Sequence, residues 1–159
     1  MPKVQLPSTP RGRKLMTRLA DLLMKNSRNK KGLFFNYGDW GSVEDGKKPG
    51  MNCGTSACAL GLAAISGKFP GLGYAIDRSS NNITLDTNLR KPGEYLTNPE
   101  IGALYFDLTD EESCHIFGGG IETEDSIGAK AERAVAKAIR KFVKGKYKPL
   151  MSVSGPVSD

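Results

Sequence analysis

Cys53 is the residue of this chain whose type and position suit it best to chemistry. It stands in the stretch MNCGTSACALGLAA, residues 51–64, whose small residues predict a short helix from about residue 55 to residue 66. The first turn of a helix lowers the pKa of a thiol through its dipole and its unpaired backbone N–H groups, which can also hold an oxyanion or a phosphate. Cys53 is therefore a candidate nucleophile. The candidate ligand-binding residues of this stretch are Cys53, Gly54, Thr55 and Ser56.

A thiol hydrolase also needs a base that takes and returns the proton, usually a histidine held by a third group. The chain contains one histidine, His115, within ESCHIFGGG. The fold could bring His115 to Cys53, although nothing in the sequence requires it. A cysteine-dependent hydrolase with Cys53 and His115 as its catalytic residues is therefore an alternative function.

A zinc site needs about four ligands, and the cysteines with the single histidine are the only soft set in the chain. Neighbouring Cys114 and His115 point in different directions on a helix, and the spacing from Cys53 to Cys58 matches no common zinc pattern. We therefore expect no metal site and no cofactor. The 3 cysteines are expected to stay reduced, because an odd number cannot pair completely and a cytosol keeps thiols free.

Small residues in the same stretch also favour a structural interpretation. They recur at spacings of three and four, which gives a helix face with almost no side-chain bulk. These residues are Gly54, Ala57, Cys58, Gly61, Ala64 and Ile65. A buried cysteine behaves as a small hydrophobic residue, so Cys58 is predicted to be structural, and Gly61 is predicted to lie where a larger side chain would clash. We interpret the helix as a tight packing seam whose N-terminus can also bind an anion.

The segment LFFNYGDW, residues 33–40, is dense in aromatic side chains and bounded by glycines, which predicts a short extended segment. Core packing is the expected role of these rings, because the domain must bury large apolar groups. Stacking on nucleobases is the alternative, since aromatic residues beside basic ones suit single-stranded nucleic acid. Tyr37 and Trp40 are the candidate ligand-binding residues of this segment.

Charge is segregated along the 159 residues, whose net charge is +6. Residues 1–50 hold 11 basic and 4 acidic side chains, residues 51–125 hold 4 and 11, and residues 126–159 hold 8 and 2. If the two basic ends meet on one face, they form a positive surface that can attract nucleic acid, nucleotides or an acidic protein. If they face the acidic middle, they hold the fold together.

Each basic end is predicted to form an amphipathic helix. Thr9 and Pro10 indicate a helix start, and apolar residues then recur at helical spacing to about Asn26. A longer helix is predicted from about Glu124 to Lys144, with an apolar stripe formed by Ile127, Ala131, Val135, Ala138, Ile139 and Phe142. The predicted basic contacts on these helices are Arg11, Arg13, Lys14, Arg18, Lys137, Arg140 and Lys141.

The middle of the chain predicts short elements: a β-hairpin over 73–86, a helix over 98–106 and a second helix over 109–117 that three glycines end. No stretch reaches the roughly 20 apolar residues of a spanning helix, and the N-terminus lacks the apolar core of a signal peptide, so we expect a cytoplasmic protein. The predicted fold is a compact single α+β domain over residues 1–145, with a small antiparallel sheet, four to five helices and the cysteine helix at its centre. Residues 146–159 are predicted to be a flexible tail.

Three motifs in order, FNYGDW, CGTSACALGLAA and YFDLTDEESCHIF, resemble a diffuse, largely uncharacterised group of small phage and bacterial proteins. The pattern of that group is an aromatic-Asn/Asp segment ending in Trp, then Cys-Gly-Thr-x-x-Cys-x-x-Gly, then Phe-Gly-Leu-Thr followed by acidic residues and Leu-Phe. The resemblance covers about residues 33–117 and departs from the pattern at Asp107, where Gly is usual, and at Leu62, where Trp is common. It implies a shared fold, and phage accessory genes imply host interaction or counter-defence.

The leading hypothesis is a non-enzymatic phage or bacterial accessory protein that acts in the cytoplasm, which is the host cytoplasm if a phage encodes it. It would bind a host or immune component through an anionic, nucleotide-like ligand or through an acidic protein surface. The charged ends and the helix N-terminus support this hypothesis, because no complete catalytic set stands beside them. The cysteine-dependent hydrolase and a nucleic-acid-binding protein are the alternatives, and no membrane partner is expected.

Overall fold

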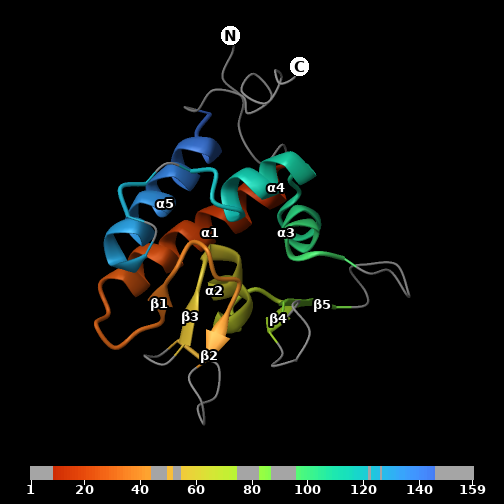
Figure 1. Ribbon diagram of the computed structural model, residues 1–159. Helices are drawn as coiled ribbons and strands as arrows, with labels where there is room; N and C mark the ends of the chain where they lie inside the picture. The colour runs from red at the N-terminus through yellow and green to blue at the C-terminus, as the bar shows by residue number, and fades with distance from the viewer. Residues whose placement is uncertain are drawn as a thin grey trace, which may run out of the picture.

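Two amphipathic helices from the two basic ends of the chain lie side by side (Figure 1). The computed structural model describes residues 9–43, 50–51, 55–74, 83–86, 96–121, 123–125 and 127–145. Helix α1 spans Pro10–Ser27 and helix α5 spans Gly128–Val143. The hydroxyl of Thr9 caps α1 by accepting a hydrogen bond from the backbone N–H of Gly12 at 3.0 Å, which confirms the predicted helix start. The apolar faces of both helices are buried in one core.

Three short strands form a mixed sheet. Strand β1 spans Phe34–Phe35, β2 spans Ser42–Val43 and β3 spans Thr55–Ala57, and their order in the sheet is β1-β3-β2. The α+β class is confirmed, but the sheet is not wholly antiparallel as predicted, because β1 runs parallel to β3. A parallel pair of strands needs a long connection. The chain from β1 to β3 provides it by first forming β2, which lies at the opposite edge of the sheet from β1.

The predicted hairpin over residues 73–86 is present as an antiparallel pair. Strand β4, Leu72–Tyr74, pairs with β5, Ile83–Leu85, and Gly73 lies opposite Thr84. The predicted turn of this hairpin lies outside the described residues, as does the predicted tail over 146–159.

Two short helices follow the hairpin in sequence, and both agree with the prediction. Helix α3 spans Asn98–Phe106 and helix α4 spans Asp110–Phe117. Each begins with a capping box, in which a threonine and a glutamate three residues later exchange hydrogen bonds. Gly118 ends α4, as expected for the first of three glycines. None of the described helices has the length and apolar character needed to cross a membrane.

The helix predicted over residues 55–66 begins later than expected. Its first residues form β3, and α2 spans Ala59–Ser66 with Cys58 as its N-cap. Thr55 is β-branched and buried in the central strand of the sheet, where a side chain of this kind favours extended backbone. Helix α2 ends at Gly67, whose φ of 72° is a left-handed conformation that glycine adopts readily.

The packing seam predicted for this helix is confirmed at Gly61. A Cβ atom placed on Gly61 would overlap the backbone carbonyl group of Trp40. Cys58 and Ala64 are buried beside it. The small residues of α2 therefore allow the backbone near Trp40 to approach the helix more closely than any larger side chain would permit.

Helix α5 begins at Gly128 and not near Glu124 as predicted. Ile127, predicted to head its apolar stripe, is 48% exposed and pairs with Asn36 in an antiparallel bridge. The extended backbone of this bridge prevents the helix from starting earlier. The remaining members of the predicted stripe are buried: Ala131, Val135, Ala138, Ile139 and Phe142.

A buried glutamate joins α5 to the end of α1. Glu132 is 2% exposed, and its Oε2 accepts a hydrogen bond from Nδ2 of Asn26 at 2.8 Å. Nδ2 of Asn26 also donates to the carbonyl oxygen of Leu33, and its Oδ1 accepts from the N–H of Leu33. Burial raises the pKa of Glu132 to about 7, and the Asn26 hydrogen bond and the Arg133 guanidinium oppose that rise.

We expect Glu132→Gln to remove a pH dependence of stability. Between the ordinary pKa of 4.5 and the raised value of about 7, the folded protein keeps a proton on Glu132 that the unfolded chain releases. The contribution of this group to the free energy of unfolding therefore falls by about 3 kcal/mol as pH rises through that window. Urea denaturation of both proteins at pH 5 and pH 8 should show the variant gaining stability relative to wild type at the higher pH. A stability difference that does not change with pH would contradict this account.

Candidate functional site

Thr55 and Ser56, two of the predicted ligand-binding residues, do not lie in the first turn of the cysteine helix as predicted, and their role in ligand binding stays a prediction. Both residues lie in β3, so their backbone groups belong to the sheet and not to the first turn of a helix. Thr55 is buried, and its hydroxyl accepts a hydrogen bond from the N–H of Gly50 at 3.2 Å. Cys53 and Gly54 lie outside the described residues, so their predicted role in ligand binding stays a prediction.

Cys58 is a packing residue, as predicted. It is 1% exposed, and its backbone N–H donates a hydrogen bond to the carbonyl oxygen of Asp39 at 2.6 Å. Burial raises the pKa of the Cys58 thiol to about 11. Because the thiolate is the nucleophile, a thiol that stays protonated at neutral pH is inert.

His115 lies on α4 with its ring edge-on to Phe142 of α5, at 6.0 Å between ring centroids. It is half-buried, and burial lowers its pKa from the ordinary value. The neighbouring Cys114 is exposed. The pair of Cys53 and His115 stays a prediction, since Cys53 is not described. Where the chain is described, no group of three or more His, Cys, Asp and Glu side chains gathers as a metal site would require.

Tyr37 and Trp40 are held by the core. The hydroxyl of Tyr37 donates to the carbonyl oxygen of Ile116 at 2.8 Å and accepts from the N–H of Ile121 at 3.1 Å. Its ring is buried, and Trp40 is partly buried against the core. The expected core packing is confirmed for Tyr37 and for Phe35, whereas Phe34 is 48% exposed on β1. Because the Tyr37 ring is buried, it cannot stack on a nucleobase.

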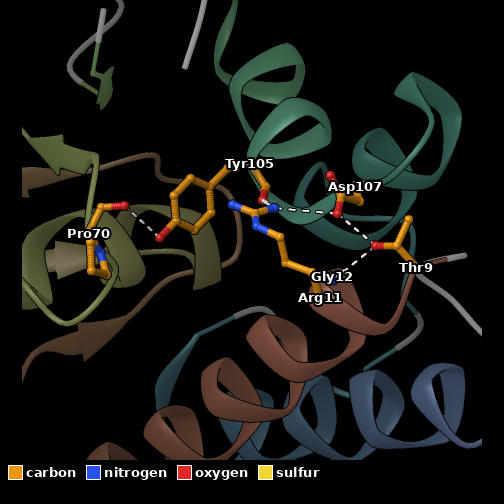
Figure 2. A network of polar contacts seen from close by, with 6 residues as sticks. All are labelled: Thr9, Arg11, Gly12, Pro70, Tyr105 and Asp107. Carbon is orange, nitrogen blue, oxygen red and sulfur yellow. Dashed lines mark hydrogen bonds and ion pairs between the residues drawn. The ribbon is translucent and has the colours of Figure 1, made fainter. Parts of the chain in front are cut away.

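Arg11, a predicted basic contact, is engaged with the acidic middle of the chain (Figure 2). Its guanidinium donates to the carbonyl oxygen of Tyr105 at 3.1 Å, lies 3.4 Å from Oδ2 of Asp107 and covers the Tyr105 ring. The hydroxyl of Thr9 donates to the same Oδ2 at 2.6 Å. Tyr105 in turn donates from its hydroxyl to the carbonyl oxygen of Pro70. This network connects the start of α1 to the end of α3, so Arg11 has a structural role.

The other basic side chains of α1 differ in exposure and in the elements that they contact. The guanidinium of Arg18 lies 6.0 Å from the centre of the Phe69 ring, on the side of α1 that faces α3 and the segment after α2. Arg13 is half-buried, and Lys14 is exposed. Lys14 lies two turns before Asp21 and therefore on the same side of the helix.

Asp21 marks the line where α1 and α5 meet at the surface. Its Oδ1 accepts a hydrogen bond from the Arg140 guanidinium at 2.9 Å. Asp21 precedes Asn26 on α1 and Arg140 follows Glu132 on α5, so the two helices are antiparallel. The solvent-facing sides of the two helices adjoin along this line. We name this surface the α1–α5 basic face, and it consists of Lys14, Arg133, Lys137, Arg140, Lys141 and Lys144.

Several cations of this face have no acidic partner in the part of the chain that the structure describes. Among the described residues, no carboxylate forms an ion pair with Lys14, Lys137, Lys141 or Lys144, whereas Lys130 at the start of α5 is paired with Glu124. Arg11 therefore faces the acidic middle, which is one of the two predicted arrangements, whereas Lys14 and the lysines of the α1–α5 basic face are exposed.

Two members of the face, Arg133 and Lys144, are absent from the predicted basic contacts. Their spacing from Lys137 and Lys141 could have identified them, because residues three and four apart share one side of a helix. The pairing of Asp21 with Arg140 has no such signal, since it joins residues 119 positions apart.

No protein-family model, curated protein or solved structure matches this chain. The resemblance of residues 33–117 to small phage and bacterial proteins stays a prediction. Any function proposed for the chain must therefore follow from the geometry described above.

Substitutions at Asp107 should separate backbone strain from side-chain contacts. Asp107 has a φ of 57°, a left-handed conformation that is costly for residues with a Cβ atom. Asp107→Ala loses the contacts to Thr9 and Arg11 and keeps the strain, whereas Asp107→Gly loses the contacts but relieves the strain. We expect both variants to be less stable than wild type, and the alanine variant to be the less stable by about 1 kcal/mol in urea denaturation. Equal stabilities would show that the backbone here is not strained.

Alkylation by iodoacetamide should distinguish the described cysteines. Cys114 is exposed and should react in the native protein at neutral pH. Cys58 should stay unmodified until the protein is unfolded, because it is buried and protonated. Tandem mass spectrometry of tryptic peptides before and after denaturation measures both, and fragmentation separates Cys58 from Cys53, which lies in the same peptide because no Lys or Arg stands between them. Rapid labelling of Cys58 in the native state would refute its assignment to the core. The same experiment reports whether Cys53 is activated.

Proposed function

We propose that this chain is a non-enzymatic binding protein that docks its α1–α5 basic face on an acidic surface of a partner protein. The observation that carries this proposal is the row of basic side chains on one side of α5, which lies next to Lys14 of α1 and includes several lysines without an ion pair among the described residues. Such a surface attracts an acidic partner over a distance and fixes its orientation. The resemblance of residues 33–117 supports a phage or bacterial accessory protein whose partner is a host or immune component.

The composition of the face favours a protein over a nucleic acid. Asp21 lies between the two helices with its side chain 65% exposed, and its ion pair with Arg140 makes that guanidinium less available to a phosphate backbone. The exposed aromatic ring among the described residues is that of Phe34, which lies on β1 and not on the face, so no ring there can stack on a base. A partner protein can answer this mixture with acids opposite the lysines and a base opposite Asp21.

A charge reversal with a matched control tests the proposal. Lys137→Glu with Lys141→Glu places two acids on the face, and Lys30→Glu with Lys31→Glu makes the same net change in the exposed loop after α1. All four side chains are exposed, so both proteins should fold, which circular dichroism checks. We expect the face variant to bind fluorescent poly-glutamate at least tenfold more weakly than wild type in anisotropy titrations, and the loop variant to change less than threefold.

The same titrations with a 20-base-pair DNA duplex decide between the two kinds of partner. Tighter binding to the duplex than to poly-glutamate at equal ionic strength would favour the nucleic-acid alternative. Equal losses in both variants would show that net charge alone attracts the acidic probe, and would overturn the assignment of a specific face.

A further inference from the structure

A cavity of about 510 Å³ lies where the end of α1 meets the segments around residues 51 and 68. Its volume falls in the range of pockets that hold small molecules. Three basic side chains of the described residues line it: Lys25 from the last turn of α1, Arg28 from its C-cap and Lys68 from the residues after α2. None of the three belongs to the α1–α5 basic face, so this basic cavity is a separate feature of the molecule.

The charge of the basic cavity is unbalanced over the part of the chain that the structure describes. No acidic residue among the described ones lines it, and none of Lys25, Arg28 and Lys68 forms an ion pair with a described residue. The ends of α1 and α2 each add about half a negative charge, so three cations leave an excess of roughly two positive charges. The last carbonyl groups of α1 already accept hydrogen bonds from the N–H groups of Arg28 and Asn29, so these cations are not needed to satisfy them.

The rest of the lining is apolar or carries an amide. Leu22 is buried and Met51 is half-buried, and together they give a surface on which a flat ring can lie. Asn26 only contributes surface to the cavity wall, because its Oδ1 and Nδ2 already form hydrogen bonds with Leu33 and Glu132. Asn29 is exposed, and its Oδ1 accepts from the N–H of Lys31, which leaves its Nδ2 without a partner among the described residues.

We infer that the basic cavity binds a phosphorylated small molecule of mononucleotide size. The phosphate lies among the ammonium groups of Lys25 and Lys68 and the guanidinium of Arg28, where two-pronged donation by arginine suits phosphate oxygens. The ring of the ligand lies against Leu22 and Met51, and the amide of Asn29 donates to its polar edge.

Isothermal titration with four probes tests the ligand class: adenosine 5′-monophosphate, ribose 5-phosphate, inorganic phosphate and adenosine. We expect the mononucleotide to bind at least tenfold more tightly than each of the other three, because it alone offers both the phosphate and the ring. Inorganic phosphate binding as tightly as the mononucleotide would reduce the cavity to a phosphate site and overturn the claim for the ring. Adenosine binding equally well would overturn the role of the cations, and the absence of binding by any probe at 1 mM would overturn the proposal.

Two matched variants place the binding in the cavity. Lys68→Gln removes one cation from the cavity and should weaken binding of the mononucleotide at least tenfold, whereas Lys137→Gln removes one from the α1–α5 basic face and should change it less than twofold. Both lysines are exposed, so both proteins should fold. Equal effects of the two variants would overturn the assignment. In the wild-type protein, the methyl resonance of Met51 should shift on addition of the mononucleotide, and a resonance that does not move would exclude contact of the ring with this wall.

Discussion

Asn26 and Glu132 hold α1 and α5 in a fixed antiparallel register, and most of the molecule is arranged around this contact. A buried carboxyl group is costly unless it is hydrogen-bonded, so the pair tolerates little sliding of one helix along the other. The same Asn26 amide holds Leu33 by two hydrogen bonds, and Leu33 leads directly into β1. The side chain of Asn26 therefore fixes the positions of both α5 and β1 relative to α1. The register also brings Asp21 opposite Arg140, and with it the charged surfaces of the two helices.

Local signals in the sequence predict the capped helices and the β4–β5 hairpin well, and they predict the three-stranded sheet and the starts of α2 and α5 poorly. Thr9 before Pro10, and Thr109 three residues before Glu112, identify helix starts because the capping chemistry is contained in a few consecutive residues. The strand at Thr55 has no comparable signal. Its extended backbone depends on β1 and β2, which lie far away in the sequence, and small residues after it continue the helical spacing. Ile127 fits the apolar stripe of α5 by spacing, but its bridge to Asn36 removes it from the helix.

The contrast between local signals and contacts of distant segments also applies to the cysteine helix. The close approach at Gly61 follows from residue size alone, so the packing seam could be predicted without knowing which backbone segment it receives. The burial of Cys58 could be predicted from the same pattern, but its contact with the segment at Asp39 could not, because that segment lies 19 residues earlier in the chain. The basic cavity has no signal in the sequence either. Lys25 and Arg28 are far from Lys68 in the chain, and the packing of the core brings these two segments together.

The bridge between Asn36 and Ile127 also covers part of a sheet edge. Strand β1 lies at one edge of the three-stranded sheet, and the N–H and C=O groups of an open edge are a template on which another chain can add a strand. The residues before α5 occupy part of this edge, next to the exposed Phe34 ring. Any event that pulls the start of α5 away from the sheet would leave an edge strand with an apolar side chain beside it. The start of α5 thus covers part of an edge on which another chain could otherwise add a strand.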